Sequence, residues 1–130
     1  MKSLEHGVNN YNIQRLHIEQ LILSCFINQN RALPMDEMDL KDIRIPFKLF
    51  KANKTTKMIA KAIYNLQEDD KPIDDVNVIT YIQKFTNLNE QEFLDINCMT
   101  WVSFDTMNLY LKQLKELDEE EKKNRILESL

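Results

Sequence analysis

The side chains suited to nucleophilic or acid–base chemistry are few and lie far apart along the chain. Cys25 has its nearest histidine, His17, about two helical turns before it, which is too far for an imidazole to activate the thiol. His6 lies near the start of the chain, and Cys98 sits within an apolar pattern, as Cys25 does. No group of histidines and cysteines has the spacing of zinc ligands. We therefore predict no catalytic residue and no metal site, and we interpret both cysteines as buried thiols of a reducing compartment.

Phosphate and cation chemistry is equally poorly supported by the sequence. The chain has a single glycine, Gly7, whereas the glycine-rich loops that cradle nucleotide phosphates need two or three. Four closely spaced carboxylates could bind a cation, but they lack the alternating spacing and the glycine of a calcium loop. They are Asp69, Asp70, Asp74 and Asp75. We interpret them as a solvated turn and a helix cap, and we predict that this chain alone binds no cofactor and is not an enzyme.

A local basic patch lies between positions 41 and 57, where six basic residues stand against the single Asp42 and give a net charge of +5. The chain as a whole has 21 acidic and 17 basic residues and a net charge of -4, which disfavours binding nucleic acid through a broad basic face. We interpret the patch as a solvated flank, and a surface that binds phosphate or acidic groups is the alternative. Its basic members are Lys41, Arg44, Lys48, Lys51, Lys54 and Lys57.

The composition indicates one all-α domain. A chain of 130 residues with 43% hydrophobic residues can bury a core, and one glycine with 3 prolines favours helices over turn-rich sheets. The first residues contain no apolar signal region, and the longest apolar stretch, 21–27, is too short to cross a bilayer. We expect a soluble, cytoplasmic protein without membrane contact.

Hydrophobic periodicity places the first elements. Residues 1–12 carry few apolar groups and are predicted to form a flexible arm. Residues 13–28 carry apolar side chains at helical spacing on a wide stripe, so this helix is expected at the centre of the core. Pro34 and Pro46 break any long helix over the next segment, where only a short helical turn near 38–43 is expected.

Three further helices follow in the sequence. One begins at a cap provided by Thr55 or Thr56 and ends near residues 68–70. The next is capped by Asp74 or Asp75 and covers about 76–83, where alternating apolar residues would also fit a strand; we predict a helix because a capping aspartate follows a proline. A third starts at 89, where Asn89 and Glu92 have capping-box spacing.

The last part of the sequence predicts two helices joined near Trp101 and Ser103, the second with apolar residues at alternating steps of three and four. We predict that this hairpin pairs with a second copy, and its complete burial against the rest of the chain is the alternative. Beyond it, 118–125 is polar on all sides, and Ile126, Leu127 and Leu130 then restore an apolar face; we interpret this stretch as a connecting rod and a frayed tail as the alternative. The predicted interface residues are Phe93, Leu94, Trp101, Met107, Tyr110, Leu111, Leu114 and Leu117.

With these elements in place, the sequence resembles the N-terminal domain of DnaB-type replicative DNA helicases. Residues 17–27 resemble the opening helix of that domain, which reads glutamate-glutamine followed by an apolar run. Residues 58–66 and the sequence Lys71-Pro72-Ile73-Asp74 resemble its second main helix and the "KPID" turn that follows. Asp70 stands where the family commonly has glycine.

The rest of the chain continues this resemblance in order. The helix at 76–83 follows the turn as in the family, and 108–111 with 125–127 downstream are similar to its last helix. The resemblance implies a compact helical head at 13–88 followed by a helical hairpin at 89–130 that runs towards a linker. It also implies a non-catalytic collar domain that pairs through its hairpins in a hexameric ring. In that family, primase and a helicase loader would dock on this collar, and the ATPase would lie in a separate motor domain.

Two other functions remain open at this point. The helicase-binding C-terminal domain of a DNA primase has a similar head-and-hairpin shape, and a zinc-binding or polymerase segment before it would identify it. A small acidic enzyme or free-standing regulator is the third possibility, which a deep pocket with convergent titratable groups would favour. A phosphate-binding loop downstream in the same reading frame would support the helicase collar.

Overall fold

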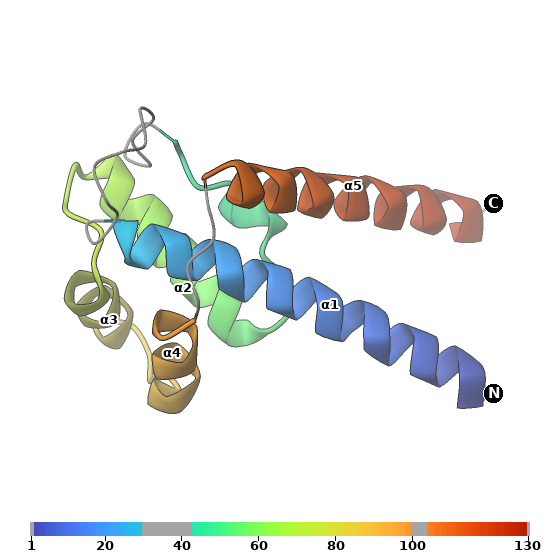
Figure 1. Cartoon of the computed structure of the whole chain (residues 1–130), viewed down its shortest axis with the longest axis horizontal. Helices are drawn as coiled ribbons and strands as arrows, with labels where there is room; N and C mark the ends of the chain where they lie inside the picture. Colours follow the sequence, from blue (N-terminus) through green and yellow to red (C-terminus); the bar gives the residue numbers. More distant parts are fainter. Residues whose placement is uncertain (1, 30–42, 100–103, 130) are drawn as a thin grey trace.

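The computed structural model describes residues 2–29, 43–99 and 104–129, and the side chains of 2–12, 104 and 129 are not described (Figure 1). These residues form five α-helices and one short 3-10 helix, with no strand among them, which confirms the predicted all-α fold. The elements are α1 (Lys2–Ile27), η3 (Phe47–Leu49), α2 (Lys54–Glu68), α3 (Asp75–Gln83), α4 (Glu90–Asn97) and α5 (Phe104–Ser129).

Helix α1 lies at the centre of the arrangement and packs against α2, α4 and α5, while α2 also packs against α3 and η3. Helices α1 and α5 run alongside each other in opposite directions and extend towards the same end of the molecule, where both chain termini lie (Figure 1). The remaining elements surround the other end of α1. The molecule is therefore a helical body from which two long helices project.

One core holds all of these elements together. Its buried side chains come from the C-terminal half of α1, from α2, α3 and α4, and from the first half of α5. Burial of one large aliphatic or aromatic side chain contributes roughly 1.5–3 kcal/mol, so these residues dominate the stability of the fold. The largest fully buried ones are Phe26, Phe50, Phe93, Ile22, Leu23, Ile45, Ile59, Ile63, Ile96, Met107 and Leu114.

The N-terminal boundary of α1 differs from the prediction. The helix starts at Lys2 and includes the stretch 2–12, for which a flexible arm was predicted. A helix that is nucleated by its buried half extends through polar residues without needing an apolar face, and no proline interrupts 2–12. The short turn predicted near 38–43 falls outside the described residues except for Ile43.

The predicted N-cap of α2 is wrong. The N-cap is Asn53, not Thr55 or Thr56, and both threonines are buried inside the first turn. The Asn53 Oδ1 accepts a hydrogen bond from the Thr56 backbone N–H at 2.8 Å, and the Thr56 Oγ1 accepts one from the Asn53 backbone N–H at 3.4 Å. This reciprocal pair is a capping box, in which the residue at the third helical position matters as much as the cap.

Helix α3 is confirmed as a helix, and of the two predicted caps, Asp74 and Asp75, it is Asp74 whose Oδ1 accepts a hydrogen bond from the Asn77 backbone N–H at 2.8 Å. Helix α4 begins after Asn89, whose side chain accepts from the Glu92 backbone N–H at 3.1 Å, as its spacing predicted. The Glu92 carboxylate accepts from the Asn53 side-chain amide at 3.4 Å, which ties α4 to the start of α2.

The arrangement of α4 and α5 differs from the predicted hairpin. Helix α5 packs against α1 and η3, whereas α4 packs against α1, so the antiparallel partner of α5 is α1. The buried residues of both helices belong to the same core as those of α1 and α2, and the described structure does not divide at residue 88. Trp101 and Ser103 lie outside the described residues. Helix α5 does continue through 118–125, as predicted for a rod, but the buried Asp118 faces the protein, not water.

Candidate functional site

The eight residues predicted to form a self-association surface lie in different environments. Four of them, Phe93, Met107, Leu111 and Leu114, are buried in the core of a single chain and are therefore not available to a partner. Tyr110 and Leu117 are partly buried at the edge of that core. Leu94 is 49% exposed, and Trp101 lies outside the described residues. The alternating steps of three and four in α5 therefore serve mainly its packing on α1 within the chain.

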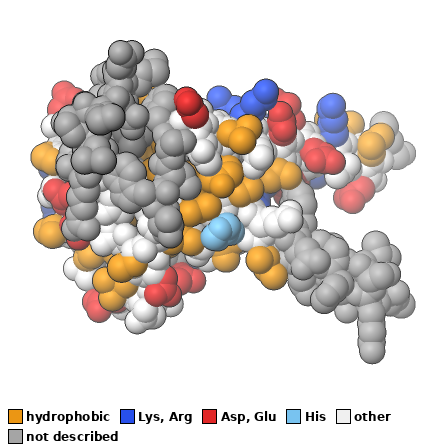
Figure 2. Space-filling model, in the orientation of Figure 1, with side chains coloured by type: hydrophobic (Ala, Val, Ile, Leu, Met, Phe, Trp, Pro, Cys, Tyr) orange, Lys and Arg blue, Asp and Glu red, His pale blue; other side chains and the backbone are white. Residues whose placement is uncertain are grey.

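A groove remains open between the two long helices. It has a volume of about 330 Å³ and includes the predicted residue Tyr110 on its α5 side. Hydrophobic side chains gather on this side of the molecule between α1 and α5 (Figure 2). The groove is lined by Gln14, His17, Ile18, Leu21, Tyr110 and Gln113. We call these residues, together with the exposed Ile13 on α1, the α1–α5 face.

Beneath the projecting part of α1 and α5 lies a buried charged network. Glu19 is fully buried, and its carboxylate accepts hydrogen bonds from the Arg15 Nε at 3.1 Å and the Thr56 Oγ1 at 2.9 Å. It also accepts from the backbone N–H groups of Lys51 at 3.1 Å and Ala52 at 3.0 Å. A buried carboxylate with this many donors is fully satisfied, so its role is to hold the segment before α2 against α1.

The same network reaches α5. The Lys51 ammonium group pairs with Asp118, and the Arg15 guanidinium lies 3.4 Å from the Glu121 carboxylate. Lys51 lowers the pKa of Asp118 through its hydrogen bond, which outweighs the opposing effect of burial, and Lys122 adds to the lowering. These pairs fix the distance between α1 and α5 just where the two helices leave the core.

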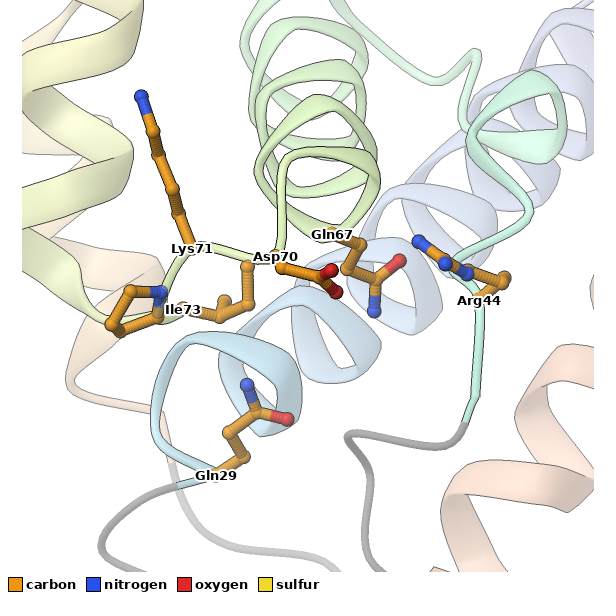
Figure 3. Close-up of a pocket in the computed structure, with 7 residues that line it drawn as sticks. Gln29, Arg44, Gln67, Asp70, Lys71 and Ile73 are labelled. Carbon is orange, nitrogen blue, oxygen red and sulfur yellow. The ribbon is translucent and has the colours of Figure 1, made fainter.

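A polar pocket of about 310 Å³ lies beside the turn between α2 and α3 (Figure 3). The Gln67 side chain is already hydrogen-bonded within the chain. Its Nε2 donates to the Ile43 carbonyl, and its Oε1 accepts from the Ile45 backbone N–H. The Lys71 side chain points away from the other labelled residues (Figure 3). The buried Oε1 of Gln29 has no hydrogen-bond partner among the described residues. The lining side chains that the structure describes offer amide, carboxylate and cationic groups for hydrogen bonding. Its lining residues are Gln29, Arg44, Gln67, Asp70, Lys71, Pro72 and Ile73.

Neither a metal-binding cluster nor a membrane-spanning helix occurs in the part of the chain that the structure describes. No group of three or more histidine, cysteine, aspartate or glutamate side chains is arranged there to hold a metal ion. No helix in the same part is long and apolar enough to span a membrane. Cys25 is buried as predicted, but Cys98 is exposed, because it is the C-cap of α4 and lies at the end of its buried face.

The fold and these surfaces together define an all-α domain with an open apolar face and a charged network that joins α1 to α5 through hydrogen bonds and ion pairs. No family model, no curated protein and no solved structure matches this chain.

Proposed function

We propose that this chain is a non-catalytic helical domain that assembles with copies of itself and docks a partner protein during DNA replication. In this proposal it serves as the collar domain of a DnaB-type replicative helicase, with primase and a helicase loader as the docked partners. The ATP-dependent motor belongs to another part of the full protein, and the complex works in the cytoplasm. The observation that carries the assembly role is the projection of α1 and α5 beyond the core.

The projecting parts carry apolar side chains that a single chain leaves in water. Beyond the contact of Arg15 with Glu121, residues 2–14 of α1 and 122–129 of α5 extend away from the core. Ile13 is 62% exposed and Leu127 is 67% exposed on these parts. Exposed apolar side chains on helices that project from the core are typical of a surface that another chain covers.

The turn between α2 and α3 supports the helicase resemblance. Asp70 has a φ of 52°, in the left-handed region that favours glycine, and glycine is common at this place in the helicase family. The Lys71 backbone N–H bonds the Leu66 carbonyl at 2.9 Å, and the Asp70 backbone N–H bonds the Gln67 carbonyl at 3.1 Å. This hydrogen-bond pair closes the helix in a Schellman motif, which requires a left-handed residue at that position.

The reading frame that encodes this chain gives the most economical test of the helicase assignment. A G-x-x-x-x-G-K-[ST] motif downstream in the same frame is the expected result, because the motor must follow the collar. A zinc-binding or polymerase segment upstream would instead assign the chain to the helicase-binding end of a primase. A frame that contains neither would leave a free-standing regulator and would contradict the proposal.

A further inference from the structure

Helices α2 and α3 form a second groove, on residues that the charged network and the α1–α5 face do not include. Its volume is about 380 Å³, within the range of pockets that bury a ligand or a few side chains, about 300–1,000 Å³. The lining residues are Lys57, Met58, Lys61, Ala62 and Asn65 from α2, and Tyr81, Ile82, Phe85 and Thr86 from α3 and the residues after it. We call it the α2–α3 groove.

The floor of the α2–α3 groove is apolar and its far wall is held in place. Ala62 and Ile82 are buried beneath it, and Phe85 stands 74% exposed at its edge. The Phe85 ring packs against the Tyr81 ring with centroids 5.3 Å apart, and the Tyr81 hydroxyl accepts a hydrogen bond from the Asn65 side-chain amide at 2.8 Å. An exposed phenylalanine on a fixed support is the kind of side chain that anchors protein interfaces.

The near wall is cationic. Lys57 and Lys61 are exposed on α2, and neither has a carboxylate within ion-pair distance among the described residues. The Lys61 side chain lines the groove, and its ammonium group lies 4.1 Å from the centre of the Phe47 ring, which is outside the groove lining. In a chain of net charge -4, two unpaired lysines beside an apolar slot are a local reversal of charge. This pattern is complementary to an acidic, partly apolar partner.

We propose that the α2–α3 groove binds an acidic amphipathic helix of a partner protein. Two apolar side chains one turn apart on that helix would fill the slot between Ala62, Ile82 and Phe85, and its carboxylates would face Lys57 and Lys61. The inference rests on the proposed docking role, since it states which surface docks the partner and what chemistry the partner has. It does not involve the projecting ends of α1 and α5.

A protein partner is favoured over single-stranded nucleic acid by the same groove. Nucleic-acid platforms place several exposed rings along a positively charged track. Here one ring, Phe85, is exposed, while Tyr81 is partly buried and hydrogen-bonded, and the floor between them is aliphatic. Acidic side chains on a helix satisfy the two lysines without requiring a row of stacking surfaces.

Fluorescence anisotropy with three labelled probes tests the proposal on the intact chain. The first probe is a synthetic helical peptide with leucines at i, i+4 and i+7 and glutamates at the positions between them. The second is the same peptide with lysine in place of every glutamate, and the third is a single-stranded oligothymidine. Saturable binding of the glutamate peptide, at least about tenfold tighter than binding of the lysine peptide and weakened by added salt, is the expected result.

Substitutions in each wall of the groove test whether the peptide binds there. Lys57→Glu combined with Lys61→Glu should weaken binding of the glutamate peptide by about tenfold or more. Phe85→Ala should weaken it by about tenfold without altering the thermal unfolding of the chain, because this ring is largely exposed. Lys112→Glu combined with Lys115→Glu, two exposed lysines on α5, makes the same change of charge elsewhere and should leave binding unchanged.

Three results would overturn the inference: equal binding of the glutamate and lysine peptides, tighter binding of oligothymidine than of either peptide, or binding that the groove variants leave unchanged. Self-association is measured separately on the same variants. If the groove variants lose peptide binding but still self-associate, the groove binds the peptide and takes no part in assembly. If the wild-type chain is monomeric but binds the peptide, the assembly role is contradicted and the proposal for the groove still holds.

Discussion

The ammonium group of Lys51 pairs with the carboxylate of Asp118, which lies 67 positions further along the chain, on α5. The backbone N–H of the same lysine donates to Glu19 on α1 at 3.1 Å. Lys51, which precedes α2 in the chain, therefore connects the two long helices that leave the core. Because Arg15 joins Glu121 across the same gap, these contacts determine where α1 and α5 separate.

Removal of the Glu19 carboxylate should be among the most destabilising single changes in the chain. In Glu19→Ala, the buried Arg15 keeps only Glu121 as an ion partner, the backbone N–H groups of Lys51 and Ala52 lose their acceptor, and breaking a buried ion pair costs about 3–5 kcal/mol. Glu19→Gln keeps one acceptor oxygen and should cost less. Urea unfolding at neutral pH measures both variants beside Glu120→Ala, an exposed acid on α5. A loss below about 1 kcal/mol for Glu19→Ala would show that the network does not hold these elements.

The pair of Lys51 with Asp118 should make stability depend on pH in the acid range. The pKa of Asp118 is lower in the folded chain, so its stabilisation is complete above the unfolded pKa of about 3.9 and is lost as the pH falls through the folded value. Asp118→Asn should therefore reduce the free energy of unfolding at pH 7 by about 1 kcal/mol, and the difference from wild type should shrink towards zero in acid.

Urea unfolding between pH 7 and pH 2 provides this comparison. Glu119→Gln, which changes the neighbouring exposed acid, is the matched control and should stay within about 0.5 kcal/mol of wild type throughout. A difference between Asp118→Asn and wild type that persists unchanged at the lowest pH would contradict the electrostatic origin of the effect.

Asp70→Gly should stabilise the chain. Asp70 adopts a φ of 52°, which costs an L-residue about 1 kcal/mol and costs glycine almost nothing. Part of that gain is offset by the greater freedom of glycine in the unfolded chain, so we expect an increase of about 0.5 kcal/mol. Thermal unfolding measures the change. Asp69→Gly, at a φ of -89°, should be neutral or destabilising, and an equal gain at both positions would show that backbone strain at Asp70 is not the cause.

Much of the fold could be predicted from local patterns, because caps and apolar spacing act within a few residues. Asn89 was predicted as the cap of α4, the cap of α3 was narrowed to Asp74 or Asp75, and the helical nature of α3 was predicted despite its strand-like alternation. The cap of α2 was predicted wrongly, because a threonine at the third position of a capping box is as polar as the cap Asn53 itself.

Long-range partners could not be predicted in the same way. The apolar steps of Met107, Leu111 and Leu114 identify a buried face but not the helix that covers it, and here that helix is α1, not a second copy. A local signal for the charged network did exist. Arg15 and Glu19 continue the stripe of Ile22 at helical spacing, and charged residues on a buried stripe require partners from elsewhere in the chain.

Sedimentation equilibrium of the intact chain tests most directly the proposal that the chain assembles with copies of itself through the projecting parts of α1 and α5. The wild type should show a weight-average mass that rises with concentration above the 15.5 kDa of one chain, and Leu127→Glu should restore that single-chain mass. Leu94→Glu, an equivalent change at an exposed leucine on α4, should associate like the wild type. A wild-type mass of 15.5 kDa up to about 1 mM protein, or association that Leu127→Glu leaves intact and Leu94→Glu abolishes, would contradict it.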